Sequence, residues 1–205
     1  MTEITNDQLT LLRTTKNSDV ELFTLKGLRT TCKVVEIYDG DTCKIVLFVG
    51  GQRQKFTARL VGLDTPEMKP ALSKANRAQE IKAAHQCRNR VLQLVTNCQG
   101  VSMDLVLKKA ECQCLLDLNT KLITVDCHEF DKYGRLLATL YETDVPNAPG
   151  ASATPIGGAS KTGANAPGAA STPIGPKSVN ERLIDEGLAK AYDGGTKDVF
   201  TYDHA

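Results

Sequence analysis

Two carboxylates stand two residues apart in the stretch YDGDT, at residues 38–42. The Asp-Gly pair is typical of a tight turn between two strands, and this turn would carry both Asp39 and Asp41. Like charges at this spacing repel each other, so either the turn is fully solvated or it lies beside a positive charge. Asp39 need not contact that charge, because an Asp in a turn can accept hydrogen bonds from backbone amides two residues on.

Other side chains suited to phosphate chemistry lie in two further motifs. The stretch ARLVGLDTPE contains Arg59, Asp64 and Glu67, and the stretch DKYGR ends on Arg135. Each motif alone can be an ordinary turn, the first as a strand end with a proline stop and the second as a hairpin with Gly134 in a left-handed conformation. Taken together with the first turn, they contain the groups that a hydrolytic site needs.

The chemistry follows from the preferences of each group. Asp41 and Asp64 come from different turns and could bind a hard divalent cation through carboxylate oxygens. Arg59 and Arg135 carry planar guanidinium groups, which bind phosphate through two parallel hydrogen bonds. Glu67 follows Asp64 by three residues and could accept a proton from an attacking water. The sequence therefore predicts hydrolysis of a phosphodiester with one metal ion.

Short strands separated by turn signals must position these motifs. The runs TTCKVVEI, TCKIVLFV and RQKFTARLV, within residues 30–61, are separated by Asp39-Gly40 and by Gly50-Gly51. Such runs predict a three-stranded meander with hairpin turns. Further strands are expected near 101–107 and 122–127 and in GRLLATLYE, which begins at Gly134.

Three segments have a helical pattern. Residues 73–97 repeat apolar side chains every three or four positions, with Ser73 as the predicted N-cap. Residues 6–16 and 179–192 are the other two segments. Short strands with helices at these places predict an α+β, mainly β fold, namely a five-stranded barrel of the oligonucleotide-binding type (OB fold) with two to three packed helices.

One segment differs from the rest in composition. Residues 146–176 are rich in Gly, Ala, Pro, Ser and Thr, and repeat NAPGA and TPIG. Such a segment cannot offset its own ordering entropy, so we predict a flexible loop inserted into the domain. The predicted organisation is an N-terminal, partly helical extension at 1–29, a barrel domain at 30–192 and a short tail at 193–205.

The bulk composition bounds the cellular setting. The 205 residues carry a net charge of +1, which neither requires nor forbids a nucleic-acid partner, because binding needs only a local basic patch. We see no signal peptide and no membrane span, and we count seven cysteines. An odd number of cysteines in a chain without such a signal predicts reduced thiols in the cytoplasm. A zinc site at Cys112, Cys114, Cys127 and His128 lacks the usual spacing, so ordinary thiols are favoured.

Four stretches in order, DGDT, RLVGLDTPE, DKYGRLLATLY and VNERLIDEGLAKAY, resemble the thermonuclease family, typified by staphylococcal nuclease. They cover most of residues 30–192. The resemblance implies a five-stranded OB-fold barrel and a Ca²⁺-dependent nuclease that cuts DNA and RNA and leaves 3′-phosphate ends. Two departures from the family are the longer segment at 108–121 and a C-terminal helix that is shortened or replaced.

Residue roles are carried over from that family by motif. Asp41 and Asp64 would be calcium ligands, together with the main-chain carbonyl of Thr65. Arg59, Glu67 and Arg135 would be the catalytic residues. The positions near the phosphates and base of a bound nucleotide would be Lys132, Tyr133 and Tyr192.

Two other functions remain open at this point. Barrels of this family also occur as non-catalytic nucleic-acid-binding modules, in which the metal and arginine positions are typically lost. The repeated loop could act as a tether or spacer, since its composition favours spacing over recognition. For the enzyme we expect little sequence specificity and DNA and/or RNA as partner, with single strands preferred. We also expect a monomer that does not bind a membrane.

Overall fold

The computed structural model describes residues 4–98, 100–142, 177–195 and 200–202. The predicted loop at 146–176 lies outside these residues, as does most of the tail beyond residue 195. The helices are α1 (Asn6–Thr14), the 3-10 helix η1 (Asn17–Asp19), α2 (Arg77–Val95), α3 (Lys109–Leu118) and α4 (Val179–Asp185). The strands are β1 (Arg29–Ile37), β2 (Thr42–Val49), β3 (Gln52–Leu60), β4 (Leu63–Asp64), β5 (Ile123–Phe130), β6 (Leu136–Glu142) and β7 (Lys190–Ala191).

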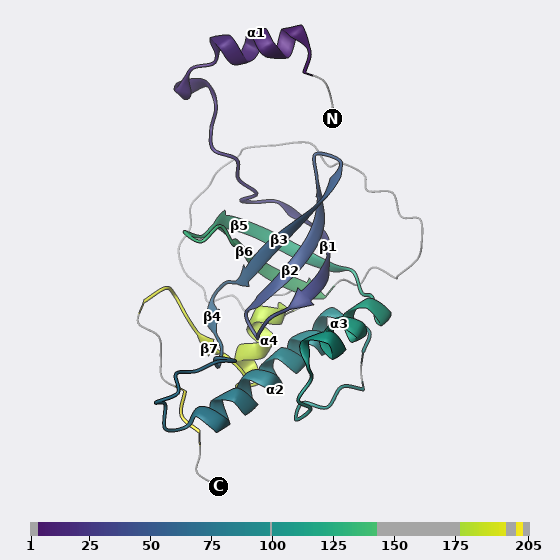
Figure 1. Cartoon of the computed structure of the whole chain (residues 1–205), viewed down its shortest axis with the longest axis vertical. Helices are drawn as coiled ribbons and strands as arrows, with labels where there is room; N and C mark the ends of the chain where they lie inside the picture. Colours follow the sequence, from purple (N-terminus) through teal and green to yellow (C-terminus); the bar gives the residue numbers. More distant parts are fainter. Residues whose placement is uncertain (1–3, 99, 143–176, 196–199, 203–205) are drawn as a thin grey trace, which may run out of the picture.

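Five of these strands close into a barrel in the order β1-β2-β3-β6-β5, which confirms the predicted fold class (Figure 1). Neighbouring strands are antiparallel except β3 and β6, which run parallel and close the sheet. The predicted meander is β1 to β3, and Gly50 and Gly51 at its second turn both have positive φ. That conformation costs glycine little, which is why this turn can be so tight.

The barrel is filled because its strands alternate between inward and outward side chains. On β2, Cys43, Ile45 and Leu47 are buried, and the residues between them are partly exposed. This period of two places one face of each strand in the interior. A continuous apolar core results, and it extends from the barrel onto α2 through Cys87, Val91 and other residues.

Helices α2, α3 and α4 lie at one end of the barrel (Figure 1). Helix α2 buries one face, and α4 buries Val179 and Leu183. By contrast, α1 buries none of its residues, and a capping box between Thr5 and Gln8 closes its first turn. Among the described residues, no helix combines the length and the apolar composition needed to cross a membrane.

Three sequence predictions were wrong in detail. Residues 101–107 form a loop before α3, because the side-chain amide of Asn89 on α2 donates to the carbonyls of Ser102, Met103 and Leu105, which a β-ladder would otherwise use. Helix α2 begins after Asn76, since residues 71–76 form consecutive turns. Helix α4 ends at Asp185, and Gly187 has a φ of 70°, which stops the helix well before residue 192.

Candidate active site

The turn between β1 and β2 is organised by Asp39. Its carboxylate accepts hydrogen bonds from the backbone N–H groups of Asp41 (3.1 Å) and Thr42 (2.7 Å), which confirms its predicted role as a turn cap. Burial, reinforced by the nearby charge of Asp41, raises the pKa of Asp39 to about 7. The turn therefore places two carboxyl groups close together, and Asp41 at its tip is 8% exposed.

Gly40 allows the turn to lie directly against helix α2. A Cβ atom at this position would overlap the sulfur of Cys87 and would lie 2.9 Å from Cγ2 of Thr65. A side chain is therefore excluded by close approach, since the φ of Gly40 is not positive. Gly40 thereby sets how closely the turn that carries Asp41 packs against Cys87 and Thr65.

Strand β3 brings an arginine to this turn. Thr42 and Arg59 are paired in the β2–β3 ladder, and the N–H of Leu60 donates to the carbonyl of Asp41 at 2.7 Å. The guanidinium of Arg59 forms an ion pair with Asp41, and its Nη2 lies 3.6 Å from Oδ1 of Asp64. One cation thus bridges two buried carboxylates that are 23 residues apart in the chain.

Two hydroxyl groups complete the environment of Asp41. Oγ1 of Thr42 donates to one carboxylate oxygen at 2.7 Å, and Oγ1 of Thr65 donates to the other at 3.0 Å. Thr65 is 3% exposed, so its side chain is part of the floor of the site. The predicted metal ligands Asp41, Asp64 and Thr65 are therefore brought together, and Thr65 contacts Asp41 through its hydroxyl group.

A two-stranded ladder near Asp64 fixes the position of Tyr192. Strand β4 pairs with β7, with Asp64 opposite Lys190. The N–H of Tyr192 then donates to the carbonyl of Gly62 at 3.0 Å. This ladder holds the C-terminal part of the domain against the strand end and places Tyr192 in the wall of the cleft described below.

Glu67 is exposed, but its backbone is hydrogen-bonded to a side chain of helix α2. Its N–H donates to Oε1 of Glu80 at 3.2 Å, and Glu80 is itself 1% exposed and ion-paired with Lys74. Sequence reasoning missed Glu80. No local signal marks it, because a glutamate in the first turn of a helix is usually exposed and only the tertiary contacts with Glu67 and Lys74 account for its burial.

The DKYGR motif forms the tight turn predicted for it, with Gly134 at a φ of 77°. The carboxylate of Asp131 accepts from the N–H groups of Tyr133 (2.9 Å) and Arg135 (2.8 Å) and from Nε of Arg135 (2.7 Å). Burial raises the pKa of Asp131, but these hydrogen bonds outweigh it and hold the pKa below its usual range. Arg135 is oriented in this way before any ligand binds.

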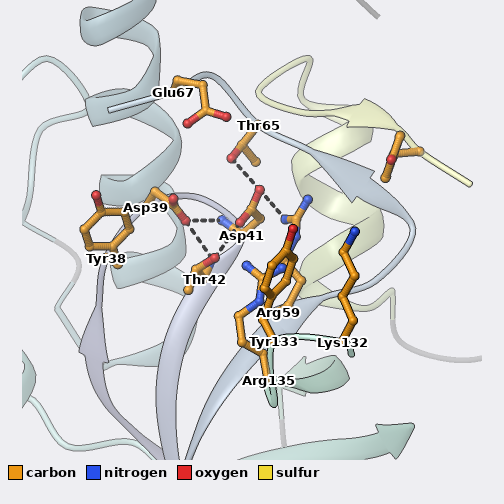
Figure 2. Close-up of a pocket in the computed structure, with 11 residues that line it drawn as sticks. Tyr38, Asp39, Asp41, Thr42, Arg59, Thr65, Glu67, Lys132, Tyr133 and Arg135 are labelled. Carbon is orange, nitrogen blue, oxygen red and sulfur yellow. Dashed lines mark hydrogen bonds and ion pairs between the residues drawn. The ribbon is translucent and has the colours of Figure 1, made fainter. Parts of the chain in front are cut away.

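These elements surround one open cleft of about 470 Å³ (Figure 2). Its walls contain every predicted site residue except Asp64, which contacts the cleft through Arg59. Lys132 and Arg135 both lie over the ring of Tyr133, at 5.1 Å and 5.5 Å from its centre. Sequence reasoning assigned no ligand contact to three further lining residues, Tyr38, Asp39 and Thr42.

The donor set suits a hard cation. Asp41, Asp64 and the two threonines offer only oxygen atoms, and both carboxylates already share one positive group, the guanidinium of Arg59. Ca²⁺ prefers such oxygen ligands and completes its shell with water. Within the described ranges, no three or more His, Cys, Asp or Glu side chains form a cluster that could hold a metal ion.

No model of a known protein family matches this chain, and no curated protein matches it either.

Proposed function

We propose that the protein is a thermonuclease-like enzyme that hydrolyses phosphodiester bonds of DNA and/or RNA with Ca²⁺ and leaves 3′-phosphate ends. The observation that carries the proposal is that Asp41, Arg59, Arg135 and Glu67 line one cleft, with a second buried acid, Asp64, paired with Arg59 behind its wall. These residues come from four separate segments of the chain. A purely structural role does not require them to meet around an open space.

The arginines supply binding and charge stabilisation. Arg59 is held by Asp41 and by the carbonyl of Leu63, and Arg135 is held by Asp131. Donors that are oriented in advance stabilise the charge that develops on a five-coordinate phosphorus without reorganising during the reaction. A Ca²⁺ ion at Asp41 and Asp64 would add charge stabilisation at a non-bridging phosphate oxygen.

Glu67 is the group best placed to handle the proton. It is exposed at the cleft, while Asp41 and Asp64 are buried and engaged by Arg59. In this scheme Glu67 accepts a proton from a water aligned opposite the leaving 5′ oxygen. The roles of base and metal ligand are thus divided between the accessible and the buried carboxylates.

The side chains that line the cleft support the expectation of little sequence specificity. The cleft presents guanidinium, ammonium and phenol groups, which address phosphate, sugar and any base face. No sequence preference follows from such contacts. We further propose that the enzyme acts as a monomer on single strands in the cytoplasm, where its seven free cysteines stay reduced.

The test is a cleavage assay with single-stranded DNA and RNA. We expect cleavage with added Ca²⁺, none after chelation, recovery when Ca²⁺ is restored, and products that carry 3′-phosphates. Circular dichroism in the same buffers verifies that the protein stays folded. A folded protein that leaves both substrates intact across a range of divalent ions rules out the nuclease.

A second candidate is a non-catalytic nucleic-acid-binding module. One observation favours it: Arg59 offsets one of the two negative charges of Asp41 and Asp64, and two hydroxyl groups donate to Asp41, so the acids lie together without a metal ion. This candidate predicts oligonucleotide binding of equal affinity with Ca²⁺ and with chelator, and no cleavage in either.

A further inference from the structure

A second, smaller pocket adjoins the cleft. It has a volume of about 270 Å³, and its lining is largely apolar, made by Glu36, Tyr38, Thr42, Cys43, Lys44 and Thr57. Tyr38 and Thr42 line both pockets, so the two spaces share a wall. We call the smaller space the Tyr38 pocket. None of the roles assigned to the cleft uses it.

The Tyr38 pocket lies at one end of the row of charged groups. Figure 2 shows Tyr38 at one end and Lys132 at the other, with Asp41 and Arg59 between them. The second aromatic group, Tyr133, lies beside Lys132. A strand that runs along this row from Tyr38 past Arg59 would therefore reach a second aromatic ring, Tyr133, beside Lys132.

The chemistry of the Tyr38 pocket suits a nucleobase. Tyr38 is 53% exposed and lines both spaces, and an aromatic side chain that borders a pocket can stack on a base. Every base has a π-face, and stacking on an aromatic side chain tolerates any sequence. The volume is smaller than the roughly 300–1,000 Å³ of pockets that hold drug-sized ligands, which fits a single ring system.

The acidic side chain in the lining of the Tyr38 pocket is neutralised by lysines, so it does not oppose a phosphate chain. Glu36 is the one acid in the lining, and it is paired with Lys44 (2.9 Å) and Lys109 (3.2 Å). Its hydrogen bond with Lys44, opposed by burial, holds the pKa of Glu36 below its usual range, so it stays charged and neutralised.

We propose that the Tyr38 pocket is a nucleotide subsite, in which the base on one side of the scissile phosphate stacks on Tyr38 while the base on the other side stacks on Tyr133. This inference rests on the nuclease proposed above. It extends that proposal because it makes a dinucleotide, not a single nucleotide, the unit that the enzyme recognises.

The experiment compares thymidine dinucleotides in which one base or the other is replaced by an abasic sugar. For the wild type, loss of either base raises KM by about tenfold, the effect of losing one base–aromatic stack. In Tyr38→Ala, KM for the full dinucleotide rises by about the same factor. Removing the base that would stack on Tyr38 then raises KM no further. In Tyr133→Ala, removing the base that would stack on Tyr133 raises KM no further.

Phe48→Ala is the matched control. Phe48 is an exposed ring on β2, 64% accessible, and it lines neither of the two described pockets. Tyr38→Phe keeps the ring and distinguishes stacking from a hydrogen bond of the hydroxyl group. Tyr38→Ala with the same KM as Phe48→Ala, in an enzyme that cleaves normally, overturns the subsite.

A binding measurement keeps the two proposals separable. In a Glu67→Gln background, anisotropy of a labelled single-stranded tetranucleotide reports Kd without cleavage. An approximately tenfold weaker Kd on adding Tyr38→Ala supports the subsite even if the wild type cuts nothing, and an unchanged Kd contradicts it. Complete absence of both cleavage and binding overturns both proposals together.

Discussion

The backbone N–H of Glu67 donates a 3.2 Å hydrogen bond to Glu80, a carboxylate that α2 buries to 1% exposure. A buried acid requires partners, and Glu80 has two, this N–H and the ammonium group of Lys74. Both partners belong to the segment between the strand end and α2. The helix thereby holds the loop on which the proposed base is carried.

Replacing Glu80 should impair the proposed chemical step more than binding. For Glu80→Ala we expect kcat to fall by about a hundredfold with little change in KM, because a small misplacement of Glu67 has that effect. The free energy of unfolding should fall by about 1–3 kcal/mol as the N–H loses its acceptor. Glu80→Gln, which keeps an acceptor oxygen, should recover part of kcat. Glu129→Gln, at an exposed paired glutamate, is the control; equal kcat in Glu80→Ala and Glu129→Gln contradicts the positioning role.

Removing the proposed catalytic groups should leave a folded protein. Arg135→Ala and Glu67→Ala should each lower kcat by on the order of a hundredfold or more, the typical cost of losing one such group. Glu67 is exposed and Arg135 partly so, so far-ultraviolet circular dichroism should not change. Arg53→Ala changes an exposed arginine on β3 and serves as the control. Near-normal turnover in either variant removes that residue from the scheme.

Gly40→Ala should destabilise the protein because the added methyl group meets the sulfur of Cys87. Overpacking of this kind costs about 1–3 kcal/mol in the free energy of unfolding, measurable by urea denaturation. Adding Cys87→Ala to Gly40→Ala should return part of that loss, although Thr65 still crowds the methyl group. Gly100→Ala is the control, since open space surrounds Gly100. Additive effects of the two substitutions would show that the sulfur is not the obstacle.

The turn that orients Arg135 should weaken in acid. The pKa of Asp131 in the fold is below its ordinary value of 3.8, because hydrogen bonds from Arg135 and Tyr133 outweigh the effect of burial. The charged form is therefore favoured by folding, and its contribution is complete above pH 3.8 and is lost as the pH falls through the lower, folded-state value.

Urea denaturation at several pH values tests this directly. Between neutral pH and pH 3, the free energy of unfolding should fall less in Asp131→Asn than in the wild type, since the variant lacks the titrating group. Asp117→Asn, an exposed aspartate on α3, should follow the wild type. Parallel pH profiles for Asp131→Asn and the wild type would contradict the assignment.

The strands of the barrel were predictable because their signal is local. Alternating side chains and glycine-containing turns marked β1 to β3, and the Asp39 turn cap followed from residue type alone. The loop at 101–107 was not predictable, because an amide on α2 takes up carbonyls that a strand would need. Glu80 was missed for a similar reason: its partners lie several residues upstream, and only tertiary packing buries it.

The position of Tyr38 between two pockets could not be predicted from the local sequence either. Its neighbours Asp39 and Asp41 explain the turn, and an exposed aromatic residue beside them has no distinct signal. Its place at the wall of two pockets depends on Thr57 of β3 and on Lys44 of β2. Which side chains are neighbours across two strands is known only once the register of the strands is known.

The two-residue ladder between β4 and β7 has a consequence for biosynthesis. An amino-terminal fragment that ends before Lys190 lacks the strand that pairs with Leu63 and Asp64, and it also lacks Tyr192 at the cleft wall. A chain still on the ribosome would therefore carry both aspartates and both arginines before the wall of the cleft is complete.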